Sequence, residues 1–376
     1  MKAPFSLAAA IILISASLAS AQPAAAPAAP AAPAAAGRAA RPPAPQRDPL
    51  AAGYVKATEL PDGQVPPMEA DGNFIIGPTH TPAPEMSPVK EGPKGTVHKF
   101  TLDSADSKFY PGVERDEPAA GAAPAGPNGT VGNHPKPYKR TVSVYVPAQY
   151  VPGTVAPVLI TTDGDGRAYN VLDHLIPQKK LPVMIVVSIP PGGPDGRGGQ
   201  RNLEYDTVSG KYSDFVETEV LPMAEKIANV KITKDPNGRA VMGTSSGAAA
   251  SMTMAWLHPE RYSRVLTFSG TFTNNQWPVD PAYPHGAWGL HETLIPNSPV
   301  KKLRIYMEVG DRDNFGGDMR DWVLANENMA KVLTEKGYHY KFVFARNAGH
   351  TDRPTISQLY PTALQWIWQG YPIEGK

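Results

Sequence analysis

Residues 240–257 read AVMGTSSGAAASMTMAWL, an expected strand, a tight turn and a helix in immediate succession. The apolar run at 240–242 is typical of a buried strand, and the small residues and methionines at 248–257 are typical of a helix. Between them, residues 243–247 form a Gly-x-Ser-x-Gly elbow, a pattern in which a strained turn raises the serine above the sheet. A side chain at either glycine would collide with neighbouring backbone. We therefore predict Ser245 as a nucleophile, the alternative being an ordinary Gly/Ser turn.

Outward from this segment, apolar strand patterns alternate with helical patterns along most of the chain. The predicted strands are 141–146, 158–160, 183–189, 240–242, 265–268, 303–309 and 340–344, and the predicted helices are 212–230, 248–257, 319–335 and 356–368. Strands that alternate with helices predict an α/β fold with a mostly parallel, doubly wound sheet and helices on both faces. In such folds the ligand site lies at the carboxyl ends of the strands.

A histidine follows the last predicted strand, within Asn347-Ala348-Gly349-His350. A serine hydroxyl needs a base close by, and histidine is the side chain that titrates in the right range unaided. Of the nine histidines, His350 is the one that lies near the end of the last strand and precedes a terminal helix. We predict His350 as the base, the alternative being a loop histidine with a structural role.

An acidic residue should stand between the serine and the histidine, because folds of this kind order their active residues as serine, acid, histidine. The predicted strand at 303–309 ends in Gly310-Asp311-Arg312-Asp313. We predict that Asp313 orients His350, and Asp311 stays open as the alternative.

An oxyanion hole needs two backbone N–H groups that point at the developing negative charge. One is expected from Ser246, and the other from Gly164 or Asp165 in the turn after the second predicted strand. The repeated Asp-Gly of this turn does not fit a calcium loop, because Arg167 and His174 occupy positions that require Asn/Asp and Glu. We predict no cofactor and no metal.

Composition limits the classes of ligand. The 376 residues include 36 Lys+Arg and 35 Asp+Glu, a net charge of +1, without the positive excess that binding to nucleic acids or acidic membranes requires. Cysteine is absent, which excludes disulfides, thiolate nucleophiles and zinc ribbons. Small molecules and neutral polymers are the expected ligands.

The first part of the chain predicts export. Residues 1–21 have the basic start, the apolar run and the final Ala-Ser-Ala of a signal peptide cleaved after Ala21, the alternative being a retained anchor. The apolar run is too short for a membrane span. We therefore expect a periplasmic or secreted protein whose mature form has no membrane span. Residues 22–94 are predicted to be an Ala/Pro-rich spacer, largely disordered. Residues 95–376 are predicted to be the folded domain.

Several segments together resemble the putative-esterase family of α/β-hydrolases, which includes esterase D and enterochelin, feruloyl and acetylxylan esterases. The segments follow the family order: 139–147 as the opening strand, Asp163-Gly164 as the oxyanion turn, 181–187 as the next strand, Arg201-Asn202-Leu203-Glu204-Tyr205 as the Arg-x-x-Glu-Tyr of the enterochelin-esterase branch, the elbow at 243–247, Gly310-x-x-Asp313 and Gly349-His350. Ala248 departs from the family, which often has a second glycine there.

This resemblance implies an α/β-hydrolase fold for residues 95–376, with Ser245, Asp313 and His350 as a catalytic triad. It implies an exported serine carboxylesterase of the feruloyl or acetyl-carbohydrate type, acting on a small-molecule or carbohydrate ester through an acyl-enzyme. Siderophore-ester hydrolysis and acyl transfer stay open, as does a non-catalytic carbohydrate-binding relative. The sequence does not indicate an oligomeric state.

Candidate substrate contacts are Arg201 and the aromatic residues of the loop at 271–298, namely Trp277, Trp288 and His291. A loop of this length after a strand usually shapes access to the site, and aromatic rings suit flat sugar or aryl faces. The alternatives are structural: Arg201 would form an ion pair, and the rings would hold the loop down.

Overall fold

The computed structural model describes residues 1, 50, 52–116, 132–193 and 199–373. The predicted signal peptide and most of residues 22–51 lie outside the described residues, so cleavage after Ala21 and export stay predictions. The described fold belongs to one compact unit, Arg41–Lys376.

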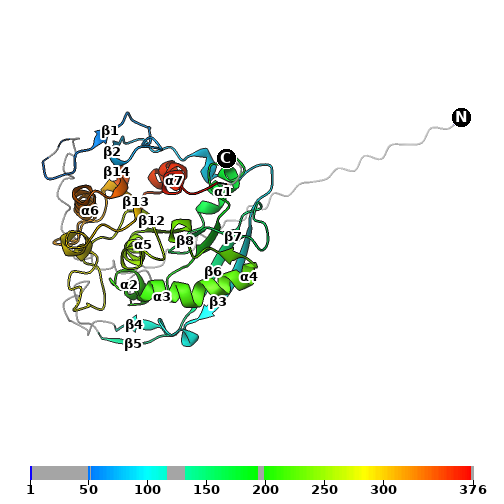
Figure 1. Ribbon diagram of the computed structural model, residues 1–376, viewed down its shortest axis with the longest axis horizontal. Helices are drawn as coiled ribbons and strands as arrows, with labels where there is room; N and C mark the ends of the chain where they lie inside the picture. Colours follow the sequence, from blue (N-terminus) through cyan, green and yellow to red (C-terminus); the bar gives the residue numbers. More distant parts are fainter. Residues whose placement is uncertain (2–49, 51, 117–131, 194–198, 374–376) are drawn as a thin grey trace. The chain divides into compact units, whose positions relative to one another are not determined.

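Apolar, β-branched runs form a ten-stranded sheet in the order β1-β2-β14-β13-β12-β11-β8-β9-β6-β3 (Figure 1). All neighbouring strands are parallel from β1 to β9, and the last two pairs are antiparallel. The strand bounds are β1 Thr58–Glu59, β2 Gly72–Ile76, β3 Thr96–Asp103, β6 Lys139–Val146, β8 Val158–Thr161, β9 Ile185–Ser188, β11 Arg239–Thr244, β12 Arg264–Phe268, β13 Arg304–Arg312 and β14 His339–Gly349. Short two-stranded pairs lie outside this sheet: β4 Val113–Arg115 with β5 Asn133–Pro135, and β7 Val155–Ala156 with β10 Lys231–Ile232.

Helices cover both faces of the sheet and bury two separate apolar clusters against it (Figure 1). One face carries α1 Ala168–Leu175 and α7 Arg353–Ile367, and the other carries α2 Gly199–Tyr205, α3 Lys211–Phe215, α4 Leu221–Ala228, α5 Ser246–Leu257 and α6 Trp322–Lys336. Because both faces are covered, every residue of β8, β9 and β12 is buried, as expected of central strands. No helix in the described part of the chain combines the length and apolar character that crossing a bilayer would take.

The predicted fold class, a mostly parallel, doubly wound α/β-hydrolase sheet with helices on both faces, is confirmed. Helix α6 begins at Trp322, later than the predicted start at residue 319. The reason is a cap: the carboxylate of Asp321 accepts the backbone N–H of Leu324 at 3.0 Å, which fixes the first helical turn. Met319 has a φ of 53°, outside the helical region.

The predicted spacer at 22–94 is wrong for its second half, because this segment adds strands to the sheet. β2 pairs in parallel with β14, and its residues Phe74, Ile75 and Ile76 are buried. The side chain of Trp366 on α7 donates to Asp71 Oδ1 at 3.0 Å, which fastens the segment to the domain. The prolines nearest to β2, Pro66, Pro67 and Pro78, lie in irregular segments on either side of this strand, so composition alone concealed it. The folded domain therefore begins well before residue 95.

Candidate active site

The turn between β11 and α5 holds Ser245 in a strained backbone conformation. Its φ is 56° and its ψ is −129°, a region that residues with a side chain rarely adopt. A Cβ added to Gly243 would collide with the backbone of Gly247, and one added to Gly247 would collide with the Thr162 hydroxyl. Both glycines are therefore required by the close approach of neighbouring atoms, backbone at Gly243 and side chains at Gly247.

The structure brings together the three residues predicted to act as a unit. His350 Nε2 lies 2.8 Å from Ser245 Oγ, and His350 Nδ1 lies 2.6 Å from Asp313 Oδ1. Asp313 is 1% exposed, whereas the imidazole stays partly accessible. With the carboxylate accepting from Nδ1–H, Nε2 is left as the acceptor for the serine proton.

Asp311, the alternative acid, points elsewhere. Its Oδ1 accepts the backbone N–H of Ala348 at 3.2 Å, so it supports the end of β14, directly before His350. The pairing of β13 with β14 shifts in register between Gly310 and Arg312, an irregularity of the sheet directly before Asp313. The geometry thus favours the acid that the sequence favoured.

The predicted oxyanion donors differ in availability. Ser246 begins α5, and the first N–H groups of a helix have no intrahelical acceptor. By contrast, Gly164 N–H donates to Ile189 O at 3.1 Å, and Asp165 N–H donates to Thr162 O at 3.2 Å. Either of these two groups would have to leave its present acceptor before it could bind an oxyanion.

Two residues that the sequence analysis missed also contact the triad. Thr271 Oγ1 lies 3.3 Å from Ser245 Oγ and accepts the indole N–H of Trp322 at 3.0 Å. The ring of Trp322 stands edge-on to that of His350, with centroids 5.9 Å apart. These residues come from a loop and a helix start, and no motif marks either position.

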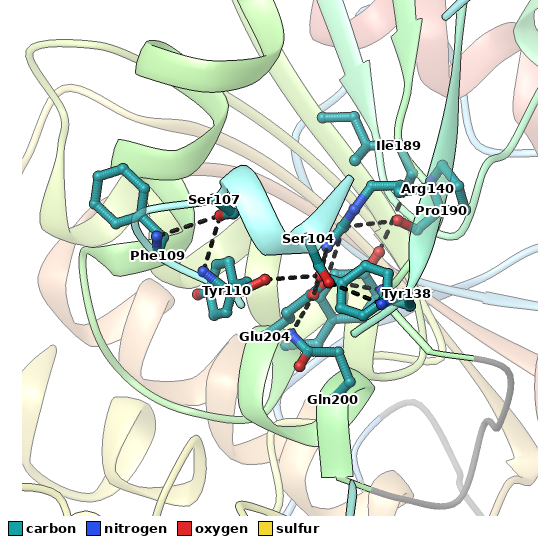
Figure 2. Close-up of polar contacts among 12 residues, drawn as sticks. Ser104, Ser107, Phe109, Tyr110, Tyr138, Arg140, Ile189, Pro190, Gln200 and Glu204 are labelled. Atoms are coloured by element: carbon teal, nitrogen blue, oxygen red, sulfur yellow. Dashed lines mark hydrogen bonds and ion pairs between the residues drawn. The ribbon is translucent and has the colours of Figure 1, made fainter. Parts of the chain in front are cut away.

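Arg201 forms an ion pair, as its structural alternative proposed. Its Nε lies 2.9 Å from Asp163 Oδ1 and its Nη2 lies 3.1 Å from Asp163 Oδ2. Glu204, on the same helix, pairs with Arg140 of β6 in a buried contact that Tyr138 and Gln200 surround (Figure 2). The Arg-x-x-Glu-Tyr segment therefore anchors α2 to its neighbours.

The aromatic residues of the loop at 271–298 mostly face the protein. Trp277 is 2% exposed, and the Arg115 guanidinium lies over its ring at 4.5 Å. His291 is 5% exposed, its Nε2 lies 3.1 Å from Phe272 O, and burial lowers its pKa to about 4. Trp288 packs edge-on against His291 at 4.5 Å. Their burial fits the alternative that they hold the loop down, and it leaves Trp277 and His291 no open face for stacking on substrate.

The region of the chain that carries the site also matches a known protein family. The sequence model of the family described as "Putative esterase" matches residues 136–362, which include Ser245, Asp313 and His350. The chain belongs to this esterase family.

Two individual proteins are similar to the chain over part of its length. The esterase is 31% identical over 136 residues to the Iron(III) enterobactin esterase of Dickeya dadantii (strain 3937), covering 33% of this chain but only 28% of that protein. It is 21% identical over 258 residues to "Uncharacterized protein YbbA" of Bacillus subtilis (strain 168), covering 64% of this chain and 96% of that one.

Similar solved structures include two kinds of esterase. One is the S954A mutant of the feruloyl esterase module from Clostridium thermocellum, with a TM-score of 0.49, 16% identity, and coverage of 79% of this chain and 96% of that one. Another is the enterochelin esterase of Shigella flexneri, with a TM-score of 0.47, 22% identity, and coverage of 61% and 55%. The esterase spans about half the length of the Shigella structure.

The side chains at the site suit acid–base and nucleophilic chemistry. Among the described residues of this esterase, no group of three or more histidine, aspartate or glutamate side chains is placed to hold a metal ion. An aligned hydroxyl, imidazole and carboxylate can generate a serine nucleophile with their own proton transfers.

Proposed function

We propose that this esterase is a serine carboxylesterase in which Ser245, His350 and Asp313 form the catalytic triad. One observation carries the proposal: the imidazole lies between the hydroxyl and the carboxylate, 2.8 Å from Ser245 Oγ and 2.6 Å from Asp313 Oδ1. The strained backbone of Ser245 supports it, because such strain is commonly kept at functional sites.

In the first half of the reaction, Ser245 Oγ attacks the ester carbonyl carbon while His350 Nε2 takes the hydroxyl proton. The negative charge that develops on the carbonyl oxygen faces the Ser246 N–H at the start of α5, where the helix dipole also favours it. Asp313 stabilises the imidazolium through its Nδ1–H. When the tetrahedral intermediate collapses, the C–O bond to the alcohol breaks and His350 returns the proton to the leaving oxygen.

In the second half, water replaces the alcohol. His350 Nε2 removes a proton from the water, the resulting hydroxide attacks the acyl carbon, and the bond to Ser245 Oγ breaks as the serine recovers its proton. For the second oxyanion contact we propose Gly164 or Asp165, once the N–H exchanges its present acceptor for the substrate oxygen.

For the substrate we propose a feruloyl or acetyl ester of a carbohydrate. The sequence resemblance to feruloyl and acetylxylan esterases supports this class. A second candidate is a siderophore ester, which the 31% identity to the iron(III) enterobactin esterase favours. Acyl transfer to a sugar acceptor would use the same acyl-enzyme, with a sugar hydroxyl in place of water.

The test is a panel of p-nitrophenyl acetate, a feruloylated oligosaccharide, acetylxylan and enterobactin, with wild type and Ser245→Ala. We expect wild type to hydrolyse at least the small aryl ester and Ser245→Ala to lose several orders of magnitude in kcat. Ser251→Ala is the matched control, because Ser251 lies on the same helix and its hydroxyl donates to Gly247 O within that helix, at 2.9 Å. Full activity in Ser245→Ala would overturn the proposal, and the preferred ester would decide between the substrate classes.

A further inference from the structure

The guanidinium of Arg201, on α2, contacts two other side chains. It donates to both carboxylate oxygens of Asp163, at 2.9 Å and 3.1 Å, and it lies over the ring of Tyr205 at 5.2 Å. Its side chain is 16% exposed. Paired arginine–carboxylate contacts of this geometry are strong and directional, so the charge of Arg201 is directed at Asp163.

Asp163 lies against the helix that carries the oxyanion site. It has a φ of 57°, and its backbone N–H donates to the Tyr205 hydroxyl at 3.2 Å. A Cβ added to Gly247 would lie 2.7 Å from Asp163 Oδ2, so this carboxylate borders the first turn of α5. The neighbouring residue in that turn is Ser246, whose N–H faces the developing oxyanion in the proposed reaction.

A second carboxylate, Asp206, approaches the same turn. It is buried, and the side-chain amides of Asn202 and Asn275 donate to its Oδ2 at 2.7 Å and 3.3 Å. Burial raises its pKa to about 6, an effect that the charge of Arg201 and the hydroxyl of Ser246 oppose. Arg201 is thus paired with Asp163, and its charge also acts on Asp206.

An uncompensated carboxylate at this place would oppose catalysis. The tetrahedral intermediate adds one negative charge next to the Ser246 N–H, and like charges within a few ångströms repel strongly in a poorly hydrated site. The ion pair of Arg201 with Asp163 counters that repulsion while keeping the Asp163 carboxylate in place.

We propose that Arg201 is a positioning residue of the esterase reaction: it compensates Asp163 so that negative charge can develop at Ser246, and it does not bind substrate. This rests on the proposed function. The proposal gives the Arg-x-x-Glu-Tyr segment a role. Glu204 fastens α2 to β6 through Arg140 (Figure 2), and that anchor holds Arg201 in register with Asp163.

The experiment is a charge-compensation cycle on p-nitrophenyl acetate, which offers Arg201 no carboxylate to bind. We expect Arg201→Gln to lower kcat roughly tenfold to a hundredfold and to change KM less than about threefold. This loss of kcat is smaller than the largest losses seen when an oxyanion donor is removed. Asp163→Asn should cost less, since asparagine also tolerates a positive φ and removes charge. The double variant Arg201→Gln/Asp163→Asn should recover most of the kcat lost in Arg201→Gln.

Two further variants keep the result decisive. Arg261→Gln breaks a matched arginine–aspartate pair, 2.6 Å from Asp214, at the far end of α5, and should leave kcat unchanged. Arg201→Lys keeps the charge and should retain more kcat than Arg201→Gln. Thermal melting of both variants will show whether a loss of kcat comes from poor folding. No rescue in the double variant would overturn the proposal, and a loss confined to KM would overturn it by assigning Arg201 to substrate binding. Inactive wild type would instead overturn the proposed function.

Discussion

The carboxylate of Asp313 meets His350 Nδ1 at 2.6 Å from a buried position at the end of β13. The side-chain NH2 of an asparagine there would donate to Nδ1 instead of accepting from Nδ1–H. The imidazole would then carry its hydrogen on Nε2 and could not accept the proton of Ser245. We expect Asp313→Asn to lower kcat by roughly three to four orders of magnitude. Asp311→Asn, which keeps an oxygen that can accept the Ala348 N–H, should cost less than about tenfold. Steady-state kinetics of both variants check this, and the reverse ranking would reassign the acid.

Thr271 should tune the nucleophile. Because Trp322 N–H already donates to Thr271 Oγ1, the threonine hydrogen is left to point at Ser245 Oγ, 3.3 Å away. We expect Thr271→Val to lower kcat roughly three- to tenfold and Thr271→Ser to restore it. Thr273→Val is the control, because the Thr273 hydroxyl is buried without a hydrogen-bond partner among the described residues. An equal loss in both valine variants would point to packing instead of the hydrogen bond.

Trp288 should act as a structural residue. It packs on the apolar core and edge-on to the buried His291, so its removal loosens the loop at 271–298 for every substrate. We expect Trp288→Ala to lower Tm by roughly 4–8 °C. Its kcat/KM should fall by similar factors for p-nitrophenyl acetate and for a bulky feruloyl ester. A selective loss on the feruloyl ester with unchanged Tm would restore Trp288 as a substrate contact.

Which features the sequence predicts depends on how local their signal is. The elbow around Ser245 and the histidine after β14 follow from short motifs next to strongly apolar strands, so their positions could be read directly. Thr271 and Trp322 reach the site only through the packing of a loop and a helix start, for which a single sequence carries no pattern. The segment containing β2 was missed because its pairing partner, β14, lies far along the chain.

The same segment makes a prediction about truncation. A chain that begins at residue 95 lacks β2, which exposes the edge of β14 and leaves the positions of Phe74, Ile75 and Ile76 empty. We expect it to be insoluble, or less stable by several kcal/mol in urea unfolding, compared with a chain that begins at residue 50. Equal stability of the two chains would show that β1 and β2 are dispensable.

Glu308 on β13 gives a prediction about pH. Burial, together with the nearby charge of Asp313, raises the pKa of this carboxyl well above its ordinary value of 4.5. Between 4.5 and the raised native pKa, the unfolded chain releases the proton while the native protein keeps it. The native state then binds more protons, so the stability contributed by Glu308 falls as the pH rises through this window.

The glutamine side chain of Glu308→Gln is neutral at all pH values, so this variant should lose that slope. Its Tm should decline less than that of wild type from about pH 5 to pH 8. Glu335→Gln, an exposed change on α6, should follow the wild-type curve. Parallel curves for all three proteins would mean that Glu308 is ionised in the native state.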